Sequence, residues 1–227
     1  MVVSIAVFMA LLDVTVVNIA FPAIQQAFPT ATRAELSWII NAYTVAFAAL
    51  LIVAGRTADL LGRRRIFFLG LATFAAGSVI SAGAQAMPFL LSGRVVQAIG
   101  SAMLLPSSLA IVLTEFPPQQ LPVAVGLWSA VAAVAAGLGP VIGASIVQGA
   151  GWRWIFVLNV PLAFTAWMLG RGLLAESRDP SASRKPDALG AITLGVAVAC
   201  LALGSYRAAS GDGWIGVFLE SFSSLLS

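Results

Sequence analysis

Long apolar segments alternate with short polar ones along the chain. A helix crosses the roughly 30 Å hydrocarbon core of a bilayer with about 20 apolar residues. Six segments approach or exceed this length and each predicts a membrane-spanning helix, at 2–21, 37–53, 66–86, 89–113, 123–147 and 155–174. Further apolar runs at 189–204 and 214–226 predict a seventh helix and the start of an eighth. The pattern therefore predicts an all-α integral membrane protein.

Polar and proline-containing stretches mark the expected breaks between these helices. Pro22 and Pro29 are expected to bound a short loop after the first span, and residues 115–122, with three prolines, to separate the fourth span from the fifth. The polar segment AESRDPSASRKPD forms a linker. The predicted organisation is a six-helix region at 1–174, the linker at 175–187 and a terminal region at 188–227.

The amino-acid composition supports a membrane protein and argues against a soluble domain, a nucleic-acid-binding protein and an enzyme. Apolar residues make up 60% of the chain and charged residues 9%, too few to cover a soluble domain of this size. The net charge of +3 is too small to suggest nucleic-acid binding. A single cysteine, Cys200, and the lack of histidine leave no disulfide and no thiolate or imidazole metal site. The sequence offers no phosphate-binding glycine loop and no nucleophile–base pair, so we expect neither an enzyme nor a cofactor.

Basic residues predict the orientation in the membrane. The stretch GRTADLLGRRR at 55–65 holds four of the twelve basic residues between two apolar segments, as expected of a cytoplasmic loop. Alternation from this loop places eight basic residues inside, namely Arg56, Arg63, Arg64, Arg65, Arg171, Arg178, Arg184 and Lys185. Only Arg33, Arg153 and Arg207 fall outside. The chain is thus predicted to be multi-pass in the inner (plasma) membrane, with its N-terminus in the cytoplasm.

Two charged residues lie within predicted spans. A carboxylate at mid-membrane costs about 2.5–3.5 kcal/mol on insertion scales, so Asp13 should face a cavity or a partner. Arg94 is the natural partner, because Asp13 lies about 16 Å and Arg94 about 21 Å from the inner face. Asp13 either exchanges a proton during transport or stays ionised and only fixes helix packing. Arg94 either pairs with it or extends toward the outer interface.

Helical periodicity adds further positions. Arg94, Gln97, Ser101 and Ser108 share one face of the fourth span, which should point into the bundle. Gly70, Gly77 and Ser81 offer close-approach positions in the third span. Small residues form two stripes on the fifth, one with Gly126, Ala130, Ala133, Gly137 and Ala144, the other with Ala132, Ala136, Gly139 and Gly143. Both stripes permit close helix packing, and Pro140 should bend this helix.

Several of these stretches carry a family resemblance. GRTADLLGRRR resembles the loop between helices two and three of the major facilitator superfamily, roughly G-x-L-A-D-[RK]-x-G-[RK]-[RK], with Thr57 and Leu60 as departures. The alternative is an ordinary basic loop. LDVTVVNIAFPAI at 12–24 resembles the first-helix signature of fourteen-helix drug/proton antiporters, from which Phe21 departs.

Three later stretches are similar to motifs of the same branch. LSGRVVQAIGSAMLLPSS at 91–108 resembles the fourth-helix motif, and WRWIFVLNVPLAF at 152–164 is typical of the branch. GLGPVIGA at 137–144 resembles the antiporter motif G-P-x2-G-G, with Ala144 in place of the last glycine. A pure packing role for these small residues is the alternative, and the two are compatible.

The resemblance implies a fold and a function. It implies the N-terminal half of a two-half transporter, built from two inverted three-helix repeats, which exports small amphipathic drugs in exchange for protons. The proton gradient, the bilayer and a C-terminal half would be its energy source and partners. The alternative is a non-transporting remnant or a membrane subunit that needs a partner half.

The implied site residues fall into three groups. Asp13 and Arg94 would couple transport to protons. Positions of the cavity or its motifs would be Asn18, Gln97, Ser101, Gly139, Pro140 and Gly143. A gating loop would contain Gly55, Asp59, Gly62, Arg63 and Arg64.

Overall fold

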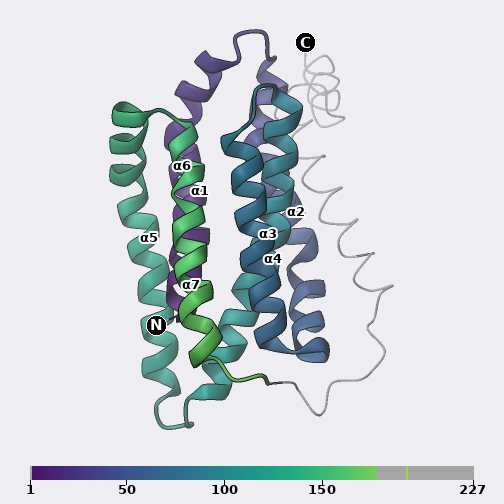
Figure 1. Cartoon of the computed structure of the whole chain (residues 1–227), viewed down its shortest axis with the longest axis vertical. Coiled ribbons are helices and arrows are strands. Elements are labelled where there is room, and N and C mark those ends of the chain that lie inside the picture. The colour runs from purple at the N-terminus through teal and green to yellow at the C-terminus, as the bar shows by residue number, and fades with distance from the viewer. Residues whose placement is uncertain (1, 178–192, 194–227) are drawn as a thin grey trace, which may run out of the picture.

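The computed structural model describes residues 2–177 and residue 193, and these residues form a bundle of helices (Figure 1). The helices are α1 (Val2–Ala27), α2 (Arg33–Leu61), α3 (Arg63–Ala82), α4 (Met87–Glu115), α5 (Leu121–Ala150), α6 (Arg153–Val157) and α7 (Asn159–Leu173). Six spans are long and apolar enough to cross a membrane, with α6 and α7 together making the sixth. The prediction of six spans within residues 1–174 is confirmed. The linker beyond Ser177 and the predicted runs at 189–204 and 214–226 lie outside the described residues, apart from Thr193.

Most helices extend beyond their predicted apolar segments, although α3 ends at Ala82, before the predicted end at 86. Pro22 lies inside α1, which continues to Ala27, so the expectation that Pro22 bounds the first loop is wrong. The predicted loop at 55–65 shrinks to one residue, because α2 runs to Leu61 and α3 begins at Arg63. Apolar runs mark where a helix meets lipid, whereas backbone hydrogen bonds continue the helix into polar surroundings. Gly55 and Asp59 are therefore helical residues, not loop residues.

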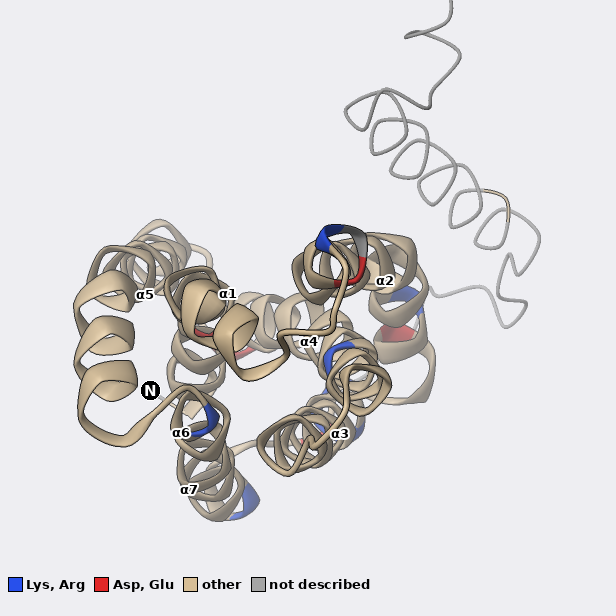
Figure 2. Ribbon diagram, turned by 90° about the horizontal axis from the view of Figure 1, so that it is seen from above, with Lys and Arg blue, Asp and Glu red and all other residues tan. Residues whose placement is uncertain are grey.

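Two interlocked groups of helices make up the bundle. Seen from above, α2, α3 and α4 lie together, and α1, α5 and the α6–α7 span lie together (Figure 2). Each group combines the first helix of one predicted three-helix repeat with the second and third helices of the other. In α1 and α4, 56% of the most apolar stretch is buried, against 17% in α2 and α5. The bundle is thus organised around α1 and α4.

Glycines allow the backbones within each group to come close. A Cβ atom on Gly77 would lie 2.6 Å from the backbone nitrogen of Gln97, and one on Gly70 3.0 Å from the Gly100 oxygen. The close approach of α3 to α4 predicted at Gly70 and Gly77 is therefore present. Gly139 and Gly143 of α5 likewise face α1, where a Cβ on Gly143 would lie 3.1 Å from Val16. By contrast, Gly126 and Gly137 of the other stripe have no neighbour within 4 Å among the described residues.

Local signals fix two helix boundaries. Thr32 caps α2 by accepting a hydrogen bond from the Glu35 backbone nitrogen (3.2 Å), and the Glu35 carboxylate accepts one from the Thr32 nitrogen (2.8 Å). This reciprocal capping box satisfies two backbone donors. In the sixth span, Pro161 has no N–H to donate to the carbonyl of Val157, and the helix is interrupted there. The interruption makes Asn159 the first residue of α7.

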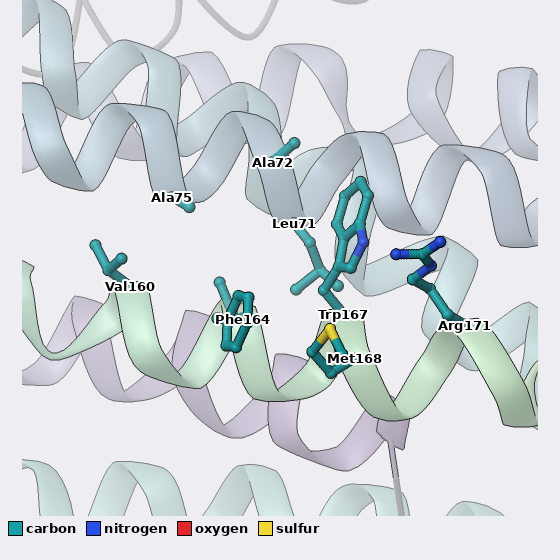
Figure 3. A pocket seen from close by; sticks show the side chains of 9 residues that line it. Leu71, Ala72, Ala75, Val160, Phe164, Trp167, Met168 and Arg171 are labelled. Carbon is teal, nitrogen blue, oxygen red and sulfur yellow. The ribbon is translucent and has the colours of Figure 1, made fainter.

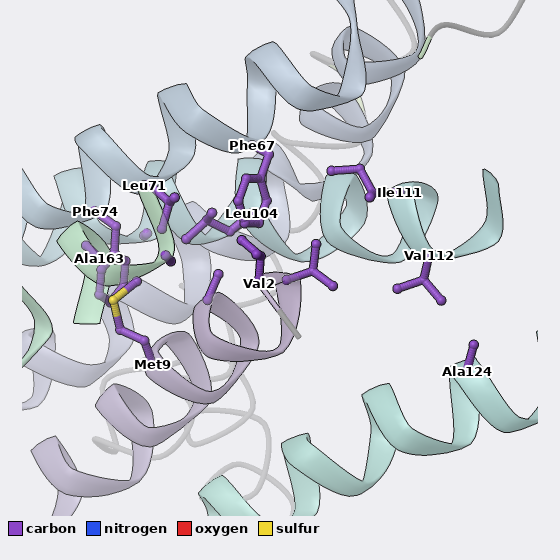
Figure 4. Close-up of a cluster of buried hydrophobic side chains, with 14 of the residues drawn as sticks. Val2, Met9, Phe67, Leu71, Phe74, Leu104, Ile111, Val112, Ala124 and Ala163 are labelled. Atoms are coloured by element: carbon purple, nitrogen blue, oxygen red, sulfur yellow. The ribbon is translucent and has the colours of Figure 1, made fainter. Parts of the chain in front are cut away.

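Two apolar clusters fill the interior, one toward each end. Figure 4 shows the first, in which Val2, Met9, Phe67, Phe74 and Leu104 meet from α1, α3 and α4. The second surrounds Leu12, Ile24, Leu90, Trp152 and Phe156 toward the opposite end. Buried polar side chains lie between the two clusters, and they form the candidate site.

Candidate functional site

A buried ion pair joins α1 to α4. Arg94 Nη1 lies 2.6 Å from Asp13 Oδ2, and the two side chains are 2% and 1% exposed. The contact expected from their similar depth is therefore present. Arg94 does not extend toward the outer interface, so that alternative is wrong.

Amide side chains complete the surroundings of the Asp13 carboxylate. Gln97 Nε2 donates to Oδ1 at 3.0 Å, and Asn159 Nδ2 donates to the same atom at 2.8 Å. Both amides also donate to Ser78 Oγ, at 2.9 and 3.3 Å, and Ser78 donates to the Phe74 carbonyl at 2.9 Å. One carboxylate thus connects four helices: α1, α3, α4 and α7.

The Arg94 guanidinium is held independently on its other side. Its Nε donates to the Ile39 carbonyl of α2 at 3.2 Å, and its Nη1 also donates to Gln97 Oε1 at 2.9 Å. The guanidinium carbon lies 4.3 Å from the centre of the Tyr43 ring, a favourable cation–π distance. The Tyr43 hydroxyl in turn donates to Ser101 Oγ at 2.7 Å. Arg94 therefore has partners on α2 in addition to Asp13.

The buried pair depends on the presence of both charges. Removing one partner of a buried ion pair leaves an uncompensated charge and is strongly destabilising, by about 3–5 kcal/mol. Asp13 is the only buried acidic side chain among the described residues.

The remaining predicted cavity residues lie elsewhere. Asn18 is exposed on α1, and its amide bonds only the Val14 carbonyl of its own helix (2.9 Å). Gly139 and Gly143 form the α1–α5 contact, and Pro140 is exposed beside them. Only Gln97 and Ser101 of this group belong to the polar cluster.

The sequence patterns did not identify three members of the polar cluster. Asn159, Ser78 and Tyr43 are all buried. Asn159 and Ser78 are polar residues inside predicted spans, and that alone was a signal that they face the interior. Tyr43 carried no such signal, because tyrosine is equally common at membrane interfaces.

The basic stretch at 55–65 forms a compact junction between α2 and α3. Gly62 joins the two helices with φ of 118°, a conformation that favours glycine. Asp59 accepts hydrogen bonds from Arg63 Nη2 (2.9 Å) and Nε (3.1 Å). Gly55 packs on Pro106 of α4. Arg64 Nη2 instead donates to the Arg171 carbonyl at 3.1 Å.

The end of the sixth span closes this junction. The carboxylate of Glu176 accepts a hydrogen bond from the Arg64 backbone nitrogen (3.2 Å) and lies 3.5 Å from Arg65 Nε. The Ser177 carbonyl accepts from the Arg63 backbone nitrogen at 3.0 Å. The first turn of α3 thus receives its acceptors from a segment more than a hundred residues away.

A separate apolar cavity of about 910 Å³ lies toward the same end of the bundle. Residues of α1, α4, α5 and α7 line it, including Phe8, Phe116, Leu127 and Trp128, while Gln119 and Gln120 give it a polar edge. None of the predicted cavity residues lines this space.

Comparison with known proteins assigns the chain to one family. The family model of the Major Facilitator Superfamily matches residues 3–226. The chain is 37% identical to the tetracenomycin C resistance and export protein of Streptomyces glaucescens, over 93% of this chain and 39% of that protein. It is 41% identical to the methylenomycin A resistance protein of Streptomyces coelicolor, over 68% of this chain and 32% of that protein. The chain thus spans about two fifths or less of the length of these relatives.

Solved structures show the same fold at low sequence identity. A mutant of the peptide transporter POT in complex with sulfate has a TM-score of 0.70 at 16% identity, covering 92% of this chain and 44% of that chain. The human organic anion transporter MFSD10 has a TM-score of 0.66 at 17% identity, covering 85% and 51%.

Proposed function

Because this chain belongs to the Major Facilitator Superfamily, we propose that it forms the N-terminal half of a transporter that exports drug-like molecules in exchange for protons. The names of the relatives, which speak of resistance and export, support the direction of transport. The observation that carries the proton-coupled part is the burial of Asp13 against Arg94, between two apolar clusters.

In the proposed cycle, a proton binds the Asp13 carboxylate and cancels its charge. The ion pair between α1 and α4 is then lost, and the two amide donors no longer face an anion. Arg94 keeps the Ile39 carbonyl, the Gln97 oxygen and the Tyr43 ring as partners. Protonation therefore loosens α1 from α3, α4 and α7, while α4 stays attached to α2.

The 910 Å³ cavity supports an amphipathic substrate. Its volume falls within the roughly 300–1,000 Å³ of typical small-molecule sites, and its lining is almost entirely apolar. Phe8 and Trp128 offer aromatic surfaces, and Gln119 and Gln120 offer hydrogen bonds at one edge. Phe8 also lies on the same helix as Asp13, so a movement of α1 would change both the proton site and the cavity.

The proposed orientation follows from the arginines. Figure 1 shows that successive spans run in opposite directions, so one end of the bundle holds Arg56, Arg63, Arg64, Arg65 and Arg171. The other end holds Arg33 and Arg153. The positive-inside rule places the first end, which we call the basic end, in the cytoplasm of a plasma membrane.

The test replaces Asp13 by asparagine, which keeps the shape and cannot release a proton. The chain is joined in frame to the C-terminal half of a family member and reconstituted in liposomes. We expect Asp13→Asn to abolish drug movement driven by an imposed pH gradient. Glu115→Gln, at an exposed carboxylate at the end of α4, should export at the parental rate.

Two results would contradict the proposal. Export by Asp13→Asn at the parental rate under the gradient would place the proton on another group. A folded parental fusion that exports nothing would favour the non-transporting membrane subunit instead.

A further inference from the structure

A groove on the outside of the bundle separates α3 from α7. Its volume is about 320 Å³. Figure 3 shows Leu71, Ala72 and Ala75 on the α3 side and Phe164, Trp167 and Met168 on the α7 side, with Arg171 at one end. We propose that this groove binds an anionic phospholipid from the leaflet at the basic end, a site independent of drug and proton transport.

The length of the groove matches one leaflet. From Val160 to Arg171 the groove follows twelve residues of α7, or about 16 Å for eleven rises of 1.5 Å. Half of a roughly 30 Å hydrocarbon core is about 15 Å. An acyl chain lying along the groove would therefore reach from mid-membrane to the level of the headgroups, where Arg171 stands.

The groove is open to the bilayer. Phe164 is 65% exposed and Met168 is 52% exposed, whereas Leu71 on the floor is buried. Small residues on α3, Ala72 and Ala75, keep the groove from being filled by side chains. Apolar walls, an open side and a depth of one leaflet favour a hydrocarbon chain as the occupant.

The charge at the end of the groove favours an anionic headgroup. Arg171 is exposed and forms no ion pair among residues 2–177. Arg64 lies beside it, with Nη2 bonded to the Arg171 carbonyl and the guanidinium 5.4 Å from the Phe68 ring centre. The Nε of Arg64 is buried without a partner in the described part of the chain.

Arg171 and the neighbouring Arg64 together place positive charge at this end of the groove, which we call the positive corner, and the exposed Arg171 guanidinium offers N–H donors to a phosphate. The nearby carboxylate of Glu176 does not cancel it, because that carboxylate pairs with Arg65 and with the first turn of α3. Basic sites between helices on the cytoplasmic side are suited to anionic headgroups. A zwitterionic lipid would bring a second cation to this corner and should bind less well.

The test uses the complete purified chain in detergent and two lipids with the same acyl chains, palmitoyl-oleoyl phosphatidylglycerol and palmitoyl-oleoyl phosphatidylcholine. Native mass spectrometry measures how much of each lipid stays bound. We expect the anionic phosphatidylglycerol to be retained in preference to the zwitterionic phosphatidylcholine. Arg171→Gln should weaken its binding about fivefold, and Ala72→Leu, which fills the groove, should lower retention of both lipids.

Arg33→Gln is the matched control, since Arg33 is an exposed arginine at the opposite end. It should leave the lipid preference unchanged. Phosphatidylglycerol should also raise the melting temperature of the parent more than that of Arg171→Gln. This second measurement tests the site without relying on gas-phase retention. Equal retention of the two lipids, a preference unaffected by Arg171→Gln, retention unaffected by Ala72→Leu, or no bound lipid would overturn the proposal. In the last case the occupant would be a second copy of the chain or residues 178–227.

Discussion

The contact between α1 and α5 predicts that adding a single carbon atom at position 139 destabilises the protein. Gly139 of α5 faces Thr15 of α1, and a Cβ atom at position 139 would lie 2.6 Å from Thr15 Cβ and closer still to Thr15 Oγ1. Carbon atoms in contact are normally about 3.5–4.0 Å apart. Thr15 has little freedom to turn away, since its hydroxyl donates to the Leu12 carbonyl at 2.9 Å. Even alanine at position 139 therefore forces α1 and α5 apart by about 1 Å.

The magnitude follows from the cost of overpacking. Extra atoms in a well-packed interior cost about 1–3 kcal/mol of unfolding free energy. For a chain of this size, 1 kcal/mol corresponds to roughly 2–4 °C in melting temperature. We expect Gly139→Ala to melt about 2–12 °C below the parent.

The matched control lies two residues away. A Cβ atom on Gly137 would meet nothing within 4 Å in the described structure, so Gly137→Ala should melt at or slightly above the parent temperature. Thermal unfolding of purified protein in one detergent, followed by tryptophan fluorescence, compares the two variants directly. A double-mutant cycle with Thr15→Ala tests the contact itself. Thr15→Ala removes Oγ1 but leaves Cβ, so the double variant should recover part of the melting temperature lost in Gly139→Ala.

Two results would refute this reasoning. If Gly139→Ala and Gly137→Ala melted at the same temperature, the close approach of α1 and α5 would not limit stability. If the effects of Thr15→Ala and Gly139→Ala were simply additive, the loss would have another cause than the contact between these two side chains.

Two further predictions concern topology and capping. In a Cys200→Ser background, Leu61→Cys at the exposed end of α2 should react with a membrane-impermeant thiol reagent only from the cytoplasm, and Thr30→Cys only from outside; labelling of Leu61→Cys from outside would reverse the orientation. Thr32→Ala removes the capping box of α2 and should cost about 1 kcal/mol of unfolding free energy, seen as a lower melting temperature. Thr44→Ala, which removes a hydroxyl bonded only within the same helix, should change the melting temperature less, and equal effects would contradict the capping role.

Much of the fold could be predicted because lipid imposes a simple rule on sequence. Each span needs an apolar length, so the number and order of the helices follow from the pattern. The same rule cannot locate helix ends, since a helix continues into polar surroundings without any change of its hydrogen bonds. That is why the junction around Gly62 was expected to be a long loop and why Pro22 was placed outside its helix.

The site was predictable as far as depth and chemistry determine it. Asp13 and Arg94 are costly in lipid and lie at similar depth, which left few arrangements other than a pair. Asn18 is five residues from Asp13 and so points about 140° away from it on an ideal helix, which is why it lies outside the polar cluster. The role of Asn159 depended on how the sixth span packs against the first, and no local pattern in the sequence contains that information.

The contact of Glu176 with the start of α3 has a consequence for the order of events during biosynthesis. Glu176 is synthesised 112 residues after Arg64, about 6–22 s later at roughly 5–20 residues per second. Until then Glu176 is absent, so it cannot pair with Arg65 or with the first turn of α3. Their positive charge is therefore not offset by Glu176 while α2 and α3 are being inserted into the membrane. Only when the sixth span has emerged does the Glu176 carboxylate arrive and join the segment after that span to the first turn of α3. In the proposed orientation, the charge that would orient the nascent chain is thus exposed during insertion and is paired with Glu176 only afterwards.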